Sequence, residues 1–266
     1  MKKCLLLLLT IFLLLFWTGC LSRPPEEDLI YEDFSIVLPE SQRYQVEIIN
    51  KKGQVLYSYE KQVNVDEKSG EIAIKDRGAN YEYTGCLNKY FILLNSQLIY
   101  KNEADIKNLG YDKRVTVFYP EERKIVLQVL TEGQVLYSKD IKLENNTYDL
   151  ESFGFFVQAL QLKGFNRFRG KVINMSNGQQ IKVEMKQLLE ESLQKLLAKK
   201  QLPEQIRNLD PKEHYYYVMG VRDWNRIFFP YKFYLILERE EPFYVTAFWG
   251  EHPRYTTFQL FKINEE

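Results

Sequence analysis

Cysteine and histidine are scarce in this chain of 266 residues, and their scarcity excludes several kinds of site. Three cysteines are present, Cys4, Cys20 and Cys86, which are too few for the disulfide framework of a small secreted protein. The two histidines, His214 and His252, match no spacing of metal ligands. We therefore expect no metal site and no other cofactor.

The short motifs of common catalytic sites are also missing. The chain has no Gly-x-Ser-x-Gly, no His-Glu-x-x-His, no Gly-rich phosphate loop and no Cys-x-x-Cys. Carboxylates are plentiful, but Glu238, Glu240 and Glu241 flank Arg239 in a pattern that is typical of an exposed hairpin tip. We therefore expect a protein that is not an enzyme, and a hydrolase with paired carboxylates is the least favoured alternative.

An excess of charge of either sign is absent, because 36 lysines and arginines balance 36 aspartates and glutamates. A protein that binds nucleic acid needs a positive field to attract the phosphates. The composition therefore predicts no nucleic-acid partner.

The hydrophobic run at the N-terminus is too short to span a membrane. Lys2 and Lys3 precede an apolar run of 14 residues, from Cys4 to Trp17, whereas a membrane-spanning helix needs about 18 or more. A positive start followed by a short apolar run is typical of a secretory signal peptide.

The residues after this run predict a lipoprotein. Gly19 and Cys20 follow it directly, and a small residue before a cysteine at this place resembles the lipobox of bacterial lipoproteins. Trp17 stands where that pattern usually has leucine. The resemblance implies that lipid is attached to Cys20, that the chain is cut before it, and that several acyl chains hold the protein stably at a membrane. An ordinary signal peptide and an uncleaved anchor are the alternatives.

The residue after the cysteine bears on the location in the cell envelope. Leu21 replaces the aspartate that often retains lipoproteins at the inner membrane, which favours the outer membrane in a bacterium that has two. In a bacterium with one membrane, the protein lies on its outer face. With Cys4 removed and Cys20 acylated, Cys86 has no disulfide partner, and we expect it to be a buried apolar side chain.

Three segments follow from these features. We expect a signal peptide over residues 1–19, the lipidated Cys20 with a polar tether over 20–33, and a β-rich exported domain over 34–266. Glycine is scarce, and 19 tyrosines and 17 phenylalanines are present, which favours strands over helices. The predicted fold is mainly β (α+β), with a curved antiparallel sheet or half-barrel and two helices.

Hairpins account for most of the domain. Strands over 44–49 and 54–60, and again over 125–130 and 134–143, flank turns that contain glycine. The hexapeptide Gly-Gln-Val-Leu-Tyr-Ser occurs at 53–58 and at 133–138, each time where a strand returns from such a turn. A duplicated hairpin and chance re-use of favourable hairpin residues both explain this repeat.

Two helices are expected between the strands. Asp149 is a candidate cap for a helix that begins near Leu150 and has one apolar face. A clearer helix is predicted over 186–200, where five leucines form a stripe, and Pro203 follows its end.

The last quarter of the chain predicts four strands, over 214–220, 226–238, 242–250 and 254–263. Side chains alternate between the two faces of a strand, and both faces here carry large apolar groups. We expect the two helices to cover one face, and the other face to close on itself, pack on a second sheet or line a cavity. The candidate ligand-binding residues are Tyr231, Phe233, Tyr244, Phe248 and Trp249.

The order of elements resembles a family of exported bacterial proteins of unknown function. The resemblance lies in residues 148–162, in Gly170-Lys171-Val172 with residues 177–183, and in Asp223, Arg226 and Pro230. It implies a fold like the open half-barrel of bacterial lipoprotein carriers, with helices in or over the concave side. No functional residue is implied by it.

Two main functions fit these expectations. One is a non-enzymatic, membrane-tethered protein that binds an apolar or amphipathic ligand, such as a lipid, in its curved sheet. The other is an interaction or scaffold protein of the envelope, which has a packed interior and binds a protein partner through a surface patch or an edge strand.

Overall fold

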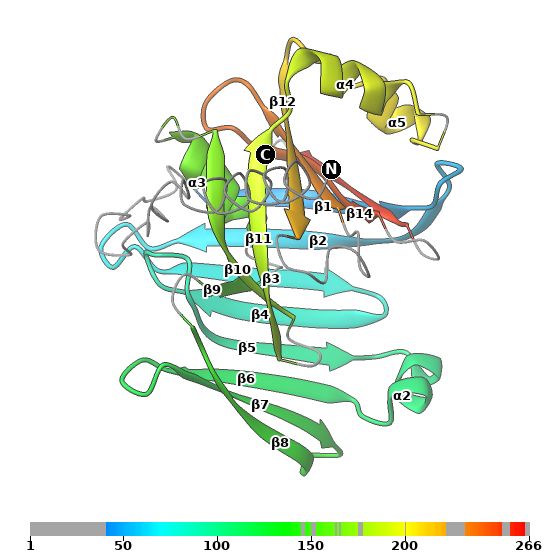
Figure 1. Cartoon of the computed structure of the whole chain (residues 1–266). Coiled ribbons are helices and arrows are strands. Elements are labelled where there is room, and N and C mark those ends of the chain that lie inside the picture. The colour runs from blue at the N-terminus through cyan, green and yellow to red at the C-terminus, as the bar shows by residue number, and fades with distance from the viewer. Residues whose placement is uncertain are drawn as a thin grey trace, which may run out of the picture. The chain divides into compact units, whose positions relative to one another are not determined.

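The computed structural model describes residues 41–144, 147–149, 153–162, 164, 166–174, 178–199, 201–221, 232–251 and 256–263. These residues belong to one compact unit, Tyr31–Glu266. The described part of this unit is built on a single curved sheet of 15 strands (Figure 1). The predicted signal peptide and Cys20 lie outside the described residues.

The strands come in two series. The first series is β1 (Gln42–Ile49), β2 (Val55–Val65), β3 (Ile72–Gly78), β4 (Tyr81–Leu87), β5 (Leu93–Tyr100), β6 (Lys113–Tyr119), β7 (Lys124–Thr131) and β8 (Gln134–Lys142). The second series is β9 (Thr147–Asp149), β10 (Arg167–Asn174), β11 (Gln179–Gln187), β12 (His214–Val221), β13 (Lys232–Glu238), β14 (Val245–Glu251) and β15 (Phe258–Ile263).

Sequential neighbours pair within each series, and β1 pairs with β15 to join the two series into one sheet. All of these pairs are antiparallel except β9 with β10, which is parallel. The two edges of the sheet are β8 and β9. The prediction of a mainly β fold with a curved antiparallel sheet is confirmed, and the hairpins around residues 50–53 and 131–133 form as expected.

Backbone pairing among the described residues does not close the sheet, but side chains connect its two edges. The Gln180 amide accepts from the Glu144 backbone N–H at 2.9 Å and donates to the Lys142 carbonyl at 2.8 Å. A small core also joins the edges, since Ile173 of β10 packs with Ile125 of β7 and Ile141 of β8. The sheet is therefore curved further than the half-barrel that the sequence predicts.

Four helices occur in the described part of the chain, rather than the two predicted. They are α2 (Glu103–Leu109), α3 (Phe153–Leu162), α4 (Glu190–Leu197) and α5 (Glu204–Arg207). The sequence carried a signal for α2, because Asn102 caps its first turn and Gly110 ends it with a positive φ. The predicted helix over 186–200 is shorter than expected, because residues up to Gln187 belong to β11.

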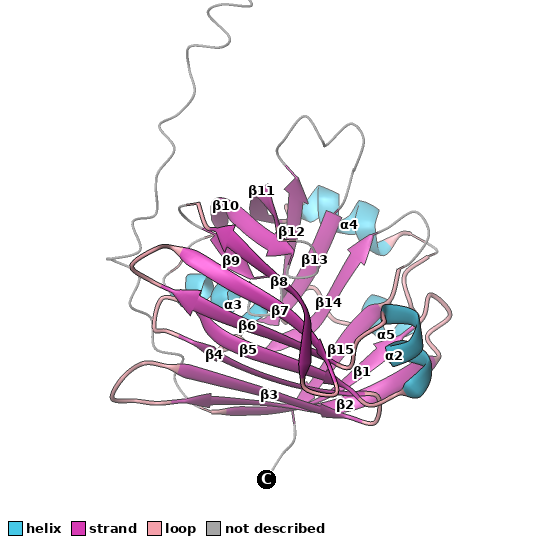
Figure 2. Cartoon of the chain, turned by 90° about the horizontal axis from the view of Figure 1, so that it is seen from below, coloured by secondary structure: helices cyan, strands magenta, loops and turns pink. Residues whose placement is uncertain are grey.

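The two longer helices cover opposite faces of the sheet, and the prediction that they share one face is wrong. Helix α3 lies within the curve of the sheet (Figure 2). Helices α4 and α5 pack on the other face of β12–β15, where Leu193 and Ile206 meet Trp249 and Phe258. The strands of the last quarter are apolar on both faces because a helix covers each face.

Helix α3 also differs from the amphipathic helix that the sequence predicts. Asp149 belongs to β9, and the helix begins at Phe153. Seven of the eight positions from Phe153 to Leu160 are buried, so nearly all sides of the helix are covered. A short helix that is buried on nearly all sides fits the interior of a curved sheet, whereas a surface helix has one apolar stripe.

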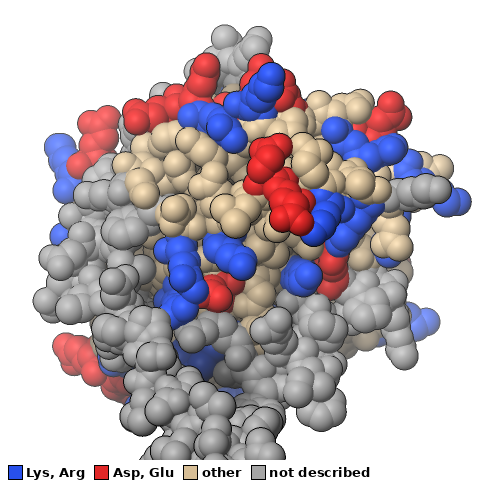
Figure 3. Space-filling model, turned by 45° about the horizontal axis from the view of Figure 1, so that its top comes forward, with Lys and Arg blue, Asp and Glu red and all other residues tan. Residues whose placement is uncertain are grey.

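Among the described residues, no helix is long and apolar enough to cross a membrane. On the face drawn in Figure 3, basic and acidic side chains are interspersed around uncharged surface. The charge balance of the composition therefore extends to this face.

Candidate functional site: an aromatic cavity within the curved sheet

A cavity of about 410 Å³ lies on the concave face of the sheet. Its wall is formed by strands from both series and by the start of α3. The aromatic part of the wall is Tyr57, Tyr59, Tyr81, Tyr100, Phe155, Phe248 and Phe261. The aliphatic part is Leu98, Leu235 and Val245. This volume falls within the usual range for small-molecule sites, which are mostly apolar with a few polar groups.

Strand alternation places the polar groups of the cavity. Tyr57, Tyr59 and Lys61 are alternate residues of β2 and project from the same face. Asp76 of β3 lies directly across from Lys61 in the register of the two strands. The hairpin register thus brings an ammonium and a carboxylate together on the cavity wall.

Lys61 and Asp76 form a buried ion pair. The Lys61 Nζ lies 2.7 Å from Asp76 Oδ1 and 3.0 Å from Oδ2. The side chains are only 7% and 4% exposed. Burial raises the pKa of the Asp76 carboxyl, and the Lys61 charge opposes this effect without cancelling it.

Aromatic rings surround the ammonium of this pair. The Lys61 Nζ lies 5.9 Å from the ring centroids of both Tyr59 and Phe155, which is within the range of a cation–π interaction. The Tyr59 and Tyr81 rings are 5.5 Å apart, and burial is the main cause of the strongly raised pKa of Tyr81. Tyr81 therefore presents a neutral hydroxyl group to the cavity at physiological pH.

Helix α3 and its aromatic neighbours fill the rest of the concave face. Phe156 stacks on Tyr148 at 4.2 Å between centroids and meets Phe168 edge-on at 4.9 Å. Phe91, in the β4–β5 turn, contacts Phe156 with ring centroids 5.9 Å apart. The interior of the sheet is thus packed around α3 and open beside it, and Phe155 and Gly154 form the boundary.

The cavity reaches the surface at Tyr57, which is 41% exposed and still belongs to the wall. Because β1 to β8 are consecutive antiparallel strands, the β1–β2, β3–β4 and β7–β8 turns and helix α2 all lie at the same end of the sheet. We call this the α2 end; it is on the right of Figure 1. Tyr57, Tyr81 and Tyr100 lie on the parts of their strands next to this end.

The predicted ligand-binding residues are separated by the structure. Phe248 lines the cavity, and Phe233 lies beside it with ring centroids 6.0 Å apart. Tyr244 is half-buried next to Tyr44, at 6.4 Å. Trp249 points to the opposite face, where it stacks on Tyr234 under α4 and α5. Tyr231 lies outside the described residues.

Sequence reasoning missed the wall that the first series contributes. Tyr57, Tyr59 and Lys61 have the period-2 spacing that signals one face of a strand, so this half of the wall was readable in principle. The contribution of Asp76 could not be predicted from the sequence, because its position opposite Lys61 depends on the register of two strands.

Cys86, Glu240 and Glu241, which the sequence offered as candidate chemical groups, do not line the cavity. Burial raises the pKa of the Cys86 thiol, and nearby Glu71 adds to the effect, so the thiol stays protonated. His252 lies outside the described residues, and within the described ones no group of three potential metal ligands is found. Glu240 and Glu241 are exposed, as expected for a hairpin tip.

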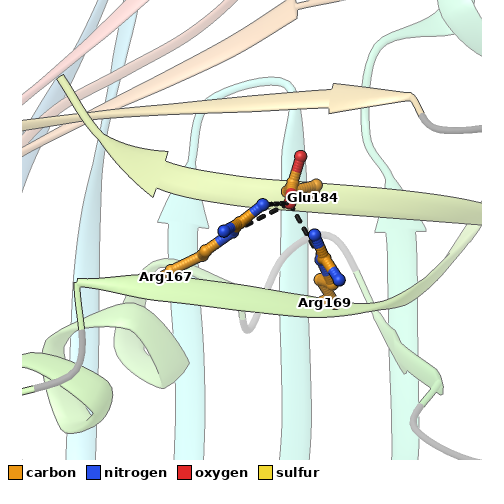
Figure 4. A network of polar contacts seen from close by, with 3 residues as sticks. All are labelled: Arg167, Arg169 and Glu184. Carbon is orange, nitrogen blue, oxygen red and sulfur yellow. Dashed lines mark hydrogen bonds and ion pairs between the residues drawn. The ribbon is translucent and has the colours of Figure 1, made fainter. Parts of the chain in front are cut away.

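Arginines and a glutamate form a polar cluster on β10 and β11 (Figure 4). Arg167 donates to Glu184 Oε1 at 2.5 Å through Nη2, and Arg169 donates to the same oxygen at 2.9 Å through Nε. Burial alone would raise the pKa of Glu184, but the two arginines outweigh it and lower the pKa. Because Phe168, between the arginines, packs on α3, this cluster lies on the outer face and supports the sheet rather than the cavity.

Comparison with known proteins gives a distant likeness in fold. No family model matches the chain, and no curated protein matches it. A solved structure, the crystal structure of a beta-barrel-like protein of the domain of unknown function DUF1849 from Brucella abortus, covers 87% of this chain and 100% of its own. The TM-score is 0.48 and the sequence identity is 8%. The described strands by themselves show a mainly β protein with one large curved sheet, and membership of an exported family stays a prediction.

Proposed function

We propose that this protein is a membrane-tethered lipoprotein of the cell envelope that binds an amphipathic ligand in the cavity of its curved sheet, without catalysing a reaction. The observation that carries the proposal is the cavity of about 410 Å³, with its aromatic wall and one buried ion pair. A scaffold protein is expected to have a packed interior, and packed interiors seldom leave a space of this size.

The wall favours a ligand with an apolar body and a small polar group. Aromatic and aliphatic side chains bury apolar surface, at roughly 25 cal/mol per Å² removed from water. The hydroxyl groups of Tyr59 and Tyr81 and the Lys61–Asp76 pair supply hydrogen-bonding groups for the polar part. Because the pair is neutral as a whole, we propose a single-chain lipid or a similar molecule with a compact head group rather than a highly charged one.

Gly154 provides a way to fill the cavity without disturbing the sheet. A Cβ atom at this position would lie 3.7 Å from Val245 Cγ2 and 3.9 Å from Leu235 Cδ1, which is ordinary van der Waals contact. Alanine therefore fits at this position without displacing its neighbours. A leucine at the same position places further carbon atoms toward the cavity.

The test is native mass spectrometry of the full chain, extracted gently from membranes. We expect a bound amphipathic species on the unsubstituted protein and on Gly154→Ala, and its loss from Gly154→Leu. A protein with no bound species, which also takes up no fluorescent fatty acid, would refute the proposal. Gly154→Leu retaining the species would show that it binds outside the cavity.

The lipoprotein part of the proposal has its own test. It is supported by the apolar run of residues 4–17 and by Cys20 after Gly19. In bacteria fed labelled palmitate, we expect the protein to carry the label and the Cys20→Ser variant to lack it. Label that persists on the Cys20→Ser variant would contradict lipidation at this residue.

A further inference from the structure

The repeated hexapeptide adopts the same structure at both of its positions. Gly53 and Gly133 each have a positive φ, at 77° and 80°, and end the turn that precedes the returning strand. Val55 pairs with Ile49, and Tyr57 pairs with Ile48, so Leu56 is an extra residue in β2. Val135 and Tyr137 pair in the same way with Leu130 and Val129, and Leu136 is the extra residue in β8. Both copies are therefore the same bulged hairpin.

Both bulged hairpins expose their apolar side chains. Val55 and Leu56 are each 53% exposed, and Val135 and Leu136 are 52% and 58% exposed. Packing within the described part of the chain does not explain these side chains, since none of the four belongs to its core. Exposed apolar residues that recur in the same local structure indicate a contact with something outside the protein.

These side chains gather at one end of the sheet. The β1–β2 and β7–β8 turns both lie at the α2 end, and α2 itself adds Leu109, which is also exposed. Seven of the eleven exposed large apolar side chains in the described part of the chain lie on β2, β8 and α2. Three separate apolar points at one end of a curved sheet suit a flat apolar partner better than a groove-filling peptide.

We propose that the α2 end docks on the surface of a lipid bilayer, with the Val-Leu pairs of the two bulged hairpins and Leu109 inserted among the lipids. Aliphatic side chains lower their free energy in the hydrocarbon, and tyrosine rings suit the interface between lipid and water. Tyr57 and Tyr137 follow the two Val-Leu pairs directly. Since Tyr57 is also part of the cavity wall, docking brings the cavity next to the lipids.

The chain before the sheet is long enough to permit this orientation. Cys20 lies 22 positions before Gln42, the first residue of β1, and a chain of this length spans at most about 75 Å when extended. Strand β1 has eight residues and is about 27 Å long. A tether of this length allows the α2 end to reach the membrane that holds the N-terminus, although β1 starts at the opposite end.

The charges at the α2 end predict how the contact depends on salt. Lys51 and Lys52 are exposed in the β1–β2 turn, whereas Glu132 lies in the β7–β8 turn and Glu103 and Asp105 begin α2. Because basic and acidic groups are mixed, the contact depends on apolar insertion and persists at high salt. A polybasic surface would be released under the same conditions.

The test uses the full chain reconstituted in vesicles whose phospholipids carry bromine on their acyl chains, which quench tryptophan by contact. Leu56→Trp and Leu136→Trp are the probes. Leu189→Trp is the matched control, because Leu189 is a leucine with 79% exposure that precedes α4, away from the α2 end. Fluorescence of the unsubstituted chain is subtracted.

We expect the tryptophans at positions 56 and 136 to lose fluorescence in brominated vesicles, and the tryptophan at 189 to keep it, at both low and high salt. Adding Leu56→Glu to Leu136→Trp is expected to restore fluorescence, because both hairpins insert together. Equal fluorescence in brominated and ordinary vesicles for both probes would overturn the proposal. The proposal would also be overturned if the probes were buried in a dimer. Sedimentation would then show a doubled mass, and the probes would not be quenched. Neither result depends on whether the cavity holds a ligand.

Discussion

The buried ion pair of the cavity gives a quantitative prediction. The Asp76→Asn substitution removes the charge that balances the Lys61 ammonium, whose side chain is 7% exposed. Leaving one partner of a buried pair uncompensated costs about 3–5 kcal/mol. A domain of this kind has a total free energy of unfolding of about 5–15 kcal/mol, so the variant is expected to lose a large share of its stability.

A double substitution separates the charge from the space that the pair occupies. Lys61→Met with Asp76→Leu removes both charges, keeps similar volume, and places a thioether near the rings of Tyr59 and Phe155. Replacement of a whole buried pair by apolar residues is often neutral, or stabilising by about 1–4 kcal/mol. We therefore expect the double variant to be at least as stable as the unsubstituted protein, to within about 1 kcal/mol.

The assay is urea unfolding of the full chain and its variants, followed by near-ultraviolet circular dichroism. The single variants Lys61→Met and Asp76→Leu complete a double-mutant cycle, which gives the coupling free energy between the two positions. A cost below about 1 kcal/mol for Asp76→Asn, typical of exposed pairs, would refute the reasoning, because water would then have to solvate the pair. Ligand that is lost from the stable double variant would show that the pair recognises the polar group of the ligand.

Three further predictions concern the surroundings of the site. Glu184→Gln is expected to lower the unfolding free energy by about 1 kcal/mol at pH 7, as for a partly exposed pair. Since the arginines lower the pKa of Glu184, this cost disappears as the pH falls through that pKa. A cost that is unchanged at pH 3 would contradict this. Burial raises the pKa of Tyr216 from 10.0 to about 12, so stability is expected to fall between these pH values, and Tyr216→Phe, measured by thermal unfolding, should not show this fall. Asn102→Ala removes the cap of α2 and is expected to cost that helix about 1 kcal/mol; amide exchange should accelerate in residues 103–109 alone, and unchanged exchange would show that the cap is dispensable.

Local pattern predicted much of the fold. Alternation and glycine-containing turns located the hairpins around residues 50–53 and 131–133. The predicted strands over 214–220 and 254–263 agree with β12 to within one residue and include all of β15. These features are readable because a hairpin depends on residues that are close in sequence. The pattern also showed that the strands of the last quarter bury both faces, which the structure confirms through α3 on one side and α4 with α5 on the other.

The cavity depended on contacts that the sequence does not display. The predicted wall consisted of aromatic residues of the last quarter. Among those that the structure describes, Phe248 lines the cavity. The pairing of β1 with β15 brings the tyrosines of β2, β4 and β5 to the same space as Phe248. A bulge between β13 and β14 turns Val245 toward the cavity with Phe248, although strict alternation assigns them to opposite faces.

The sequence by itself determined the strand-rich composition, the balanced charge and the repeated hexapeptide, and it predicts the lipidated N-terminus. Each of these depends on residue types and on spacing within a short segment. Only the tertiary structure decided that both copies of the hexapeptide lie at the same end of the sheet, that α3 enters its interior, and that Lys61 meets Asp76 beside an open cavity. The physical reason is that sheet curvature and strand order arise from packing over the whole chain, whereas alternation and turn chemistry act between near neighbours.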